Sequence, residues 1–341
     1  MTPAIVRQYQ LFTGIDIAAK SFTASWTTDR LRFAPPCTFS YDDQGIAELQ
    51  QRLLATGISP CTILVVLEAT GSYWVRLAVA LHAAGFAISV VNPAQTHHWA
   101  QSLSRRGKTD PLDARMLTQF AAERQPSLWT PPPNVYHELR QRLSARDALR
   151  ELRQQAYNQR HALAQWPERV PSVMACLDAV IADLEQRLEY LEAEIKQVLH
   201  EGEWARSAEL LESIPGIGML TAAWLLVLTV NFSACASAEA AVNYAGLAPL
   251  QRESGTSVRG RTQLEQGGNV RLRTVLYLAT LSAARHNLMI KVFYERLRAA
   301  GKPMKVARCA AARKLLHLAY AVVTKQQPFD AAYAKGISEG A

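Results

Sequence analysis

The chain has 341 residues, of which 49% are hydrophobic and 19% charged, and its formal net charge is +8. This composition excludes a disordered or fibrous protein, and the length favours two domains or a domain with an extension. Five cysteines without CxxC spacing indicate neither a disulfide framework nor a zinc cluster, so we expect a protein of the reducing cytoplasm without a signal peptide.

The first 125 residues alternate between strand-like and helix-like patterns. Three short strand-like runs come first. They are followed by two apolar strands, each preceded by a segment with helical spacing. Three strands followed by helix-linked strands favour a mixed sheet with helices on both faces. The predicted elements are strands at 11–18, 21–28, 37–41, 62–68 and 86–92, and helices at 42–56, at 73–84 and after residue 92.

The segment "WTPPPNV" at 129–135 marks a boundary, because three consecutive prolines cannot continue a helix. Beyond it, apolar residues recur at intervals of four and three, which predicts a coiled-coil hairpin or dimer arm. The preceding helix, 136–165, is rich in arginine. Its arginines either pair with acids of the seam helix or face nucleic acid, and the sequence leaves both possibilities open. The seam consists of Leu177, Ile181, Leu184, Leu188, Leu191, Ile195 and Val198.

From about residue 205 the pattern is helical again. The apolar run 219–230 is too short to cross a bilayer and predicts a buried helix. A Gly/Ser-rich stretch at 246–269 interrupts the helices, and loops of this length usually carry a function. Residues 250–325 hold 15 Lys or Arg against three acids, which indicates either a polyanion-binding module or a solvated basic face.

Four carboxylates could meet at one edge of the predicted sheet. Asp16 and Glu68 stand where the first strand and the central strand end, and adjacent parallel strands bring their carboxyl ends together. Asp110 and Asp113 are three residues apart at the start of a helix and therefore share one face. Taken alone, this second pair also suits a helix N-cap followed by Pro111 and an acid in the first turn.

A cluster of like charges is unfavourable unless a cation neutralises it. Oxygen ligands without nitrogen or sulfur suit Mg²⁺ or Mn²⁺, and two such ions can clamp the attacking and leaving oxygens of a phosphodiester. Arg105, Arg106 and Lys108 lie just before the aspartate pair and could hold the phosphate backbone.

Two further motifs could act on nucleic acid. "IPGIG" at 214–218 fits a helix-hairpin-helix, in which Gly216 and Gly218 would let backbone N–H groups approach a phosphate; a plain interhelical turn is the alternative. Ser254 is followed by glycine in a loop rich in arginine. Serine needs activation and no histidine lies nearby in sequence, so its chemistry alone favours a loop hydrogen bond over nucleophilic attack.

Together these segments resemble the DEDD-type insertion-sequence transposases, a family that includes pilin-gene DNA invertases and bridge-RNA-guided recombinases. The resemblance covers nearly the whole chain and is carried by the order and spacing of "GIDIAAK", "LEATGSYW", "VVNPAQ", "KTDPLDA", "IPGIG", "YAGLAP" with "ESG", "GGNVRLR" and "VFYERLRAAGK". It implies an α/β RNase H-like (RuvC-like) domain at 1–130, a coiled-coil arm at 135–204 and a mainly α-helical transposase domain with a helix-hairpin-helix at 205–330.

The resemblance also implies the site residues. Asp16, Glu68, Asp110 and Asp113 would be the metal-binding tetrad, with Mg²⁺ or Mn²⁺, and Ser254 the nucleophile, whereas the motif disfavours the nearby Ser257. The implied reaction conserves bond energy in a phosphoserine link to DNA. Residues that we expect to contact nucleic acid are Arg105, Arg106, Lys108, Gly216, Gly218, Arg259, Arg261, Arg271 and Arg273.

The expected partners are donor and target double-stranded DNA, a structured guide (bridge) RNA that reads them by base pairing, and further copies of the chain, as a dimer that assembles into a tetramer. We expect the protein in the prokaryotic cytoplasm, at the nucleoid when bound to DNA, and away from membranes. Alternatives are a RuvC-like junction nuclease using water as the nucleophile, a sugar-kinase-like or actin-like ATPase, and a noncatalytic nucleic-acid scaffold. The ATPase requires a second Gly-rich phosphate loop, and the sequence has none.

Overall fold

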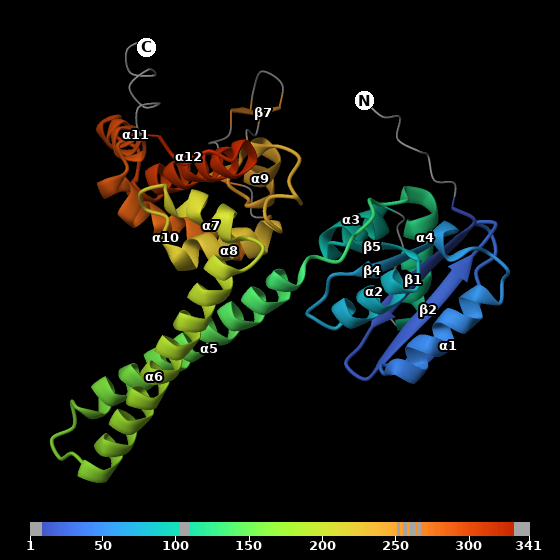
Figure 1. Ribbon diagram of the computed structural model, residues 1–341, viewed down its shortest axis with the longest axis horizontal. Helices are drawn as coiled ribbons and strands as arrows, with labels where there is room; N and C mark the ends of the chain where they lie inside the picture. The colour runs from blue at the N-terminus through green and yellow to red at the C-terminus, as the bar shows by residue number, and fades with distance from the viewer. Residues whose placement is uncertain are drawn as a thin grey trace. The chain divides into compact units, whose positions relative to one another are not determined.

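The computed structural model describes residues 9–102, 110–250, 253–254, 258–259, 263–264 and 267–330. The chain forms two compact units, Met1–Pro131 and Pro132–Ala341, and each is described by itself (Figure 1). None of the helices within the described ranges is both long and apolar enough to span a membrane.

The first unit contains a five-stranded mixed sheet in the order β3-β2-β1-β4-β5. β2 runs antiparallel to β1 and β3, whereas β4 runs parallel to β1 and β5. The strands are β1 (Leu11–Ile17), β2 (Ser21–Thr27), β3 (Cys37–Ser40), β4 (Ile63–Glu68) and β5 (Ala87–Val91). The helices are α1 (Asp43–Leu54), α2 (Trp74–Ala83), α3 (Pro93–Ser102) and α4 (Asp110–Arg124), with a 3-10 turn, η1 (Pro60–Thr62). The predicted mixed sheet and its chain order are confirmed.

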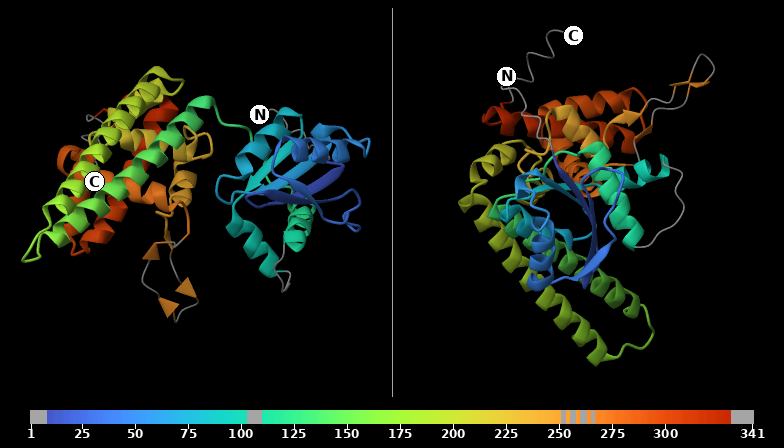
Figure 2. Two further views of the ribbon diagram at one scale, coloured as in Figure 1. Left: turned by 90° about the horizontal axis from the view of Figure 1, so that it is seen from below. Right: turned by 90° about the vertical axis from the view of Figure 1, so that its right-hand side faces the viewer.

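Alternate residues of the central strands enter two separate cores. Leu11 and Ile15 of β1 pack with residues of α1 and α2, whereas Phe12 between them packs with Trp99 of α3 and Leu117 of α4. In β4 the same alternation sends Val65 and Leu67 to the first core and Leu64 and Val66 to the second. Successive side chains of a strand point to opposite faces, so the sheet has helices on both faces, as Figure 2 shows.

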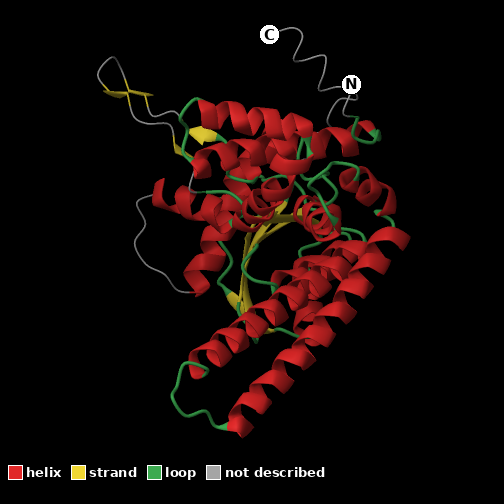
Figure 3. Cartoon of the chain, turned by 90° about the vertical axis from the view of Figure 1, so that its left-hand side faces the viewer, coloured by secondary structure: helices red, strands yellow, loops and turns green. Residues whose placement is uncertain are grey.

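The second unit begins with two long helices, α5 (Asn134–Leu163) and α6 (Pro171–Glu201), that pack against each other as a hairpin (Figure 3). Ile181, Leu184, Leu188 and Ile195 of the predicted seam are buried. Arginines of α5 face acids of α6 in antiparallel order, in the pairs Arg142–Glu194, Arg146–Glu192, Arg153–Glu185 and Arg160–Asp178. For these four arginines, the pairing alternative is therefore confirmed.

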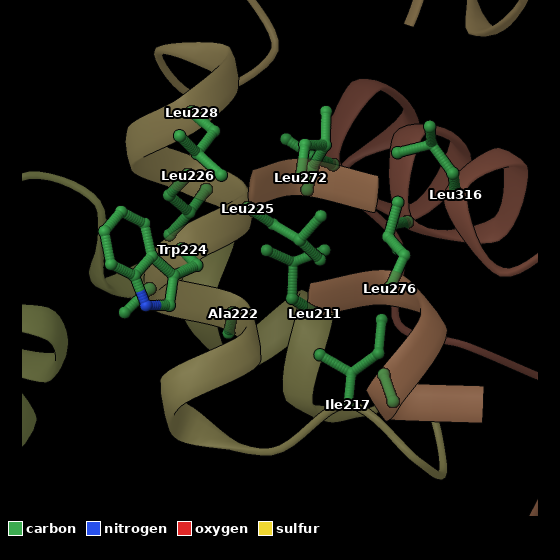
Figure 4. Close-up of a cluster of buried hydrophobic side chains, with 14 of the residues drawn as sticks. Leu211, Ile217, Ala222, Trp224, Leu225, Leu226, Leu228, Leu272, Leu276 and Leu316 are labelled. Carbon is green, nitrogen blue, oxygen red and sulfur yellow. The ribbon is translucent and has the colours of Figure 1, made fainter. Parts of the chain in front are cut away.

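The remaining helices of this unit enclose one apolar core, part of which is drawn in Figure 4. Its centre is the predicted buried helix, in which every residue from 222 to 229 is buried. The helices are α7 (Ala205–Glu212), α8 (Met219–Thr229), α9 (Ala238–Tyr244), α10 (Val270–His286), α11 (Leu288–Ala299) and α12 (Met304–Lys325).

The stretch between α9 and α10, expected to be a loop, also contains short antiparallel strand pairs. β6 (Pro249–Leu250) pairs with β9 (Gln263–Leu264), and further out β7 (Glu253–Ser254) pairs with β8 (Val258–Arg259). Strands of two residues are too short to show the alternation of apolar and polar residues that identifies a strand in a sequence. The glycines and serines of this stretch therefore indicated a loop.

Candidate functional site

Asp16 and Glu68 lie next to each other at one end of the sheet. The parallel register pairs Ile15 of β1 with Leu67 of β4, so the residues that follow stand side by side at the carboxyl ends of the two strands. Both belong to the alternating set that faces α3 and α4, since Phe12 and Val66 on the same sides of their strands pack there. The expectation that these two strand-end carboxylates reach one crevice fits this register.

Helix α4 is held against β1 at Gly14, two residues before Asp16. A Cβ atom on Gly14 would lie 2.1 Å from the backbone nitrogen of Thr118 and 2.6 Å from the carbonyl oxygen of Ala114, so only glycine allows this approach. The Gly14 N–H donates to the Thr118 hydroxyl at 3.0 Å, and that hydroxyl lies 2.8 Å from the Ser25 carbonyl oxygen of β2. The crossing brings the segment of α4 beginning at Asp113 onto the face that carries Asp16.

Asp110 is the first residue of α4, one turn before Asp113, and its side chain lies outside the described part of the chain. The proposed phosphate contacts Arg105, Arg106 and Lys108 also lie outside it. Three carboxylates of the predicted tetrad therefore belong to described side chains: two on the sheet and one on the helix crossing it.

Glu68 has a partner that the sequence did not indicate. The buried hydroxyl of Thr96 on α3 lies within hydrogen-bonding distance of Glu68 Oε1 and of the Pro93 carbonyl oxygen, 2.9 Å away. A hydroxyl that donates to a carboxylate orients it and leaves its other oxygen available. In the sequence, Thr96 is visible only as a threonine one turn into the helix that follows β5. Many helices carry such a residue for packing alone, so the sequence did not point to its contact with Glu68.

Asp16, Glu68, Asp113 and Thr96 all offer oxygen atoms, which is the ligand chemistry that suits hard divalent cations. Among the side chains that the structure describes, no three His, Cys, Asp or Glu groups are gathered closely enough to constitute a metal site. Asp110, the fourth acid, is outside that set. The chemistry of these oxygens suits Mg²⁺ or Mn²⁺, but the described carboxylates Asp16, Glu68 and Asp113 do not by themselves gather into a metal site.

The segment with Ser254 is a narrow antiparallel ladder. The backbone of Ser254 pairs with Val258, and Glu253 pairs with Arg259. The side chains of Ser254 and Arg259, and the whole of Ser257 and Arg261, lie outside the described residues.

Arg271 and Arg273, two of the expected nucleic-acid contacts, make contacts within the protein. The Arg271 guanidinium lies 4.4 Å from the centre of the Trp224 ring and forms an ion pair with Asp147 of α5. Burial, together with the positive charge of Arg146, lowers the pKa of Arg271. Arg273 donates to the carbonyl oxygens of Ala245 and Gly267, at 3.2 and 3.0 Å. Both side chains thus brace α10 against its surroundings.

In the turn between α7 and α8 the two glycines differ. Gly216 has φ +104°, and a Cβ atom there would lie 2.5 Å from Cα of Ala283, so this glycine lets the turn contact α10. Gly218 precedes α8 without a capping side chain, and a Cβ atom there would meet open space. Of the two glycines, Gly218 is the one that leaves open space at the start of a helix, where a phosphate could approach the backbone.

Comparison with known proteins covers both units. A model for transposases of the IS110 type matches residues 13–165, and the model described as "Transposase IS116/IS110/IS902 family" matches residues 208–295. The pilin gene-inverting proteins of Moraxella lacunata and Moraxella bovis are each 32% identical over 322 residues, covering 94% of this chain and 97% of theirs. A 43.6 kDa protein of insertion element IS110 from Streptomyces coelicolor is 34% identical over 154 residues, covering 45% of this chain and 36% of its own. The chain therefore belongs to the IS110/IS116/IS902 family of transposases, enzymes that recombine DNA.

Proposed function

We propose that this transposase cuts and rejoins DNA through a covalent bond between Ser254 and a DNA phosphate, with divalent cations held by Asp16, Glu68, Asp110 and Asp113. The observation that supports it best is the junction of β1, β4 and α4. There Asp16 and Glu68 stand side by side at the ends of their strands, and α4, which carries Asp113, packs against the same face of the sheet. This strand order, with acids after β1 and β4, supports assigning residues 1–130 to the RuvC-like (RNase H-like) fold.

The serine step is an exchange of one phosphoester for another. The Ser254 oxygen forms a bond to phosphorus and loses its proton, while the bond from phosphorus to a sugar oxygen breaks and that oxygen gains a proton. The reverse exchange, with a different sugar hydroxyl, rejoins the strand, so neither ATP nor a polymerase is needed. The bound cations would stabilise the charge that develops on the phosphoryl oxygens.

Two contacts within the described residues support the positions of three of the acids. Glu68 is oriented by Thr96, and Asp16 and Asp113 are set by the crossing at Gly14. Without a cation, four carboxylates at one sheet end would repel one another. Mg²⁺ and Mn²⁺ are the ions whose oxygen preference fits this set.

Nucleic acid is the partner that the basic residues support. We assign phosphate contacts to Arg105, Arg106, Lys108, Arg259 and Arg261, and to the α8 start at Gly218, where Gly216 shapes the helix-hairpin-helix. DNA binding should fall ~10³-fold or more between 50 and 200 mM salt if six to ten phosphates are contacted. The pilin gene-inverting relatives support DNA as the substrate.

The remaining features of the proposal concern assembly and guidance. We assign residues 135–204 to a coiled-coil arm through which copies of the chain associate as a dimer and then a tetramer, and residues 205–330 to the transposase domain. A structured bridge RNA would choose the donor and target duplexes. The protein would act in the prokaryotic cytoplasm, at the nucleoid.

A junction nuclease that uses the same acids with water as its nucleophile is the second candidate, and substitution of the serine separates the two. Wild type, Ser254→Ala and the control Ser257→Ala would each be incubated with DNA carrying the element ends, its flanking transcript and Mg²⁺. Wild type and Ser257→Ala should form a protein-DNA adduct whose linked peptide contains Ser254. Ser254→Ala should form no adduct and cut no DNA. Cleavage that persists in Ser254→Ala would establish the nuclease and refute the serine mechanism.

A further inference from the structure

The chain segments that enter and leave the Ser254 loop are tied together at its base, within described residues. The backbone N–H of Asn269 donates to the carbonyl oxygen of Tyr244 at 2.6 Å, and the Asn269 side-chain amide donates to the Tyr244 hydroxyl at 3.0 Å. Asn269 also caps α10 by accepting from the N–H of Leu272 at 3.0 Å. One residue therefore joins the end of α9 to the start of α10.

Two glycines let the segments cross in direct contact. A Cβ atom on Gly246 would lie 2.3 Å from the carbonyl oxygen of Gly267, and one on Gly268 would lie 2.5 Å from the nitrogen of Gly246. Both glycines have positive φ, +65° and +80°. Any side chain at either position would push the segments apart, since backbone atoms are the obstacle on both sides.

Arg273 closes this crossing from the first turns of α10. A single guanidinium nitrogen donates to Ala245 on the entering segment, at 3.2 Å, and to Gly267 on the leaving segment, at 3.0 Å. Hydrogen bonds from a charged donor are stronger than neutral ones. The guanidinium thus bridges the two segments next to the point where the glycines touch.

We propose that Arg273 is a positioning residue for Ser254, which it serves by locking the two ends of the loop rather than by contacting nucleic acid. From the crossing outward, β6 pairs with β9 and, further along the same loop, β7 pairs with β8, the pair that contains Ser254. The register differs by one residue between the two pairs, so the tie at the base holds the loop that carries Ser254 without dictating the register of the outer pair. This inference rests on the proposed serine mechanism. It gives Arg273 a role different from the phosphate contact expected from its basic sequence context.

The expected effect is on the chemical step and not on affinity. A displacement of about 1 Å at a reacting group can cost about 100-fold in rate. A phosphate contact, by contrast, would weaken binding for all sequences and lower the salt slope by about one. Arg273→Met removes both hydrogen bonds while keeping the length of the side chain, and Arg273→Lys keeps a positive donor of similar reach.

The test compares wild type, Arg273→Met, Arg273→Lys and the control Arg206→Met, which removes an exposed arginine that pairs with Glu209 on its own helix. Three quantities are measured: DNA affinity at several salt concentrations, the single-turnover rate of Ser254 adduct formation at saturating DNA, and amide hydrogen exchange along 244–269. Arg273→Met should lose about 100-fold in adduct rate, keep wild-type affinity and salt slope, and exchange faster at the loop base. Arg273→Lys should recover part of the rate, and Arg206→Met should match wild type in all three.

A lower affinity with a smaller salt slope in Arg273→Met would make Arg273 a phosphate contact and overturn the inference, as would an unchanged adduct rate. If Arg273→Met does not fold, Tyr244→Phe replaces it, because this change removes the hydrogen bond between the Asn269 amide and the Tyr244 hydroxyl. Tyr244→Phe should slow adduct formation by ~5-fold and leave the DNA affinity unchanged. An unchanged rate would refute the role of the contacts at the loop base. If wild type forms no adduct, the proposed function fails. Independently of that result, unchanged amide hydrogen exchange in Arg273→Met would refute the claim that Arg273 holds the two segments of the loop base together.

Discussion

The crossing of α4 over β1 provides the most direct test of the acid site, through Gly14→Ala. The new Cβ atom would lie 2.1 Å from the Thr118 nitrogen and 2.4 Å from the carbonyl carbon of Leu117, where ordinary contacts are 3.4–4 Å. Because those are backbone atoms of a packed helix, α4 must move away by about 1 Å. Overpacking of this kind costs ~1–3 kcal/mol, and the weakened hydrogen bond from Gly14 to Thr118 costs ~1 kcal/mol more.

The same displacement separates the acids on the sheet from Asp113 on the helix. We expect Gly14→Ala to unfold at lower urea, by ~2–4 kcal/mol, and to lose about 100-fold in adduct rate with a higher requirement for Mg²⁺. The control is Gly57→Ala, where φ is +74° but nothing lies within 4 Å of the added methyl group. It should cost ~1 kcal/mol of backbone strain and leave the adduct rate unchanged. Wild-type stability and rate in Gly14→Ala would refute the role of the crossing.

Three further outcomes are expected. Thr96→Val removes the hydroxyl that orients Glu68 and should raise the Mg²⁺ concentration for half-maximal activity by ~10–100-fold, as a metal titration would show; an unchanged midpoint would argue against orientation. Ile195→Ala should destabilise the second unit by ~2–5 kcal/mol in urea unfolding, because this side chain is fully buried, and a loss under ~1 kcal/mol would contradict that burial. Burial lowers the pKa of His200, but its hydrogen bonds to a backbone carbonyl and to Glu212 raise it more, so the net shift is upward from 6.5. The pair should therefore add stability below pH 6.5 that is lost as the pH rises through the folded pKa, and the stability difference between wild type and His200→Ala, measured by urea unfolding, should shrink with rising pH.

Sequence patterns predicted the sheet because its strands obey simple periodicity. The alternation in β1, with Leu11 and Ile15 on one face and Phe12 on the other, is visible in the letters alone. The α6 seam is equally regular, since apolar positions at alternating intervals of four and three are typical of a helix that packs along another helix. These features depend only on neighbours in sequence.

Contacts between distant segments were not predictable in this way. Gly14 was part of a motif, but nothing in the letters shows that it lies beneath Ala114 and Thr118 of α4. Thr96 resembles any helical threonine until Glu68 is placed beside it. Arg273 stands in a basic stretch, which favours a nucleic-acid contact, while its actual acceptors are backbone carbonyl oxygens, a group that every residue carries.

The ion pairs between α5 and α6 do not by themselves fix how the two helices align along their length. Arg146, Arg153 and Arg160 recur every seven residues, and so do their partners Glu192, Glu185 and Asp178, at the same interval as the apolar seam. If α5 slid by seven residues along α6, arginines would still lie opposite acidic residues, and the leucines of the seam would still face the partner helix. The short connection at 164–170 must therefore select the observed alignment, and lengthening it would free each helix to pair with the complementary helix of a second molecule.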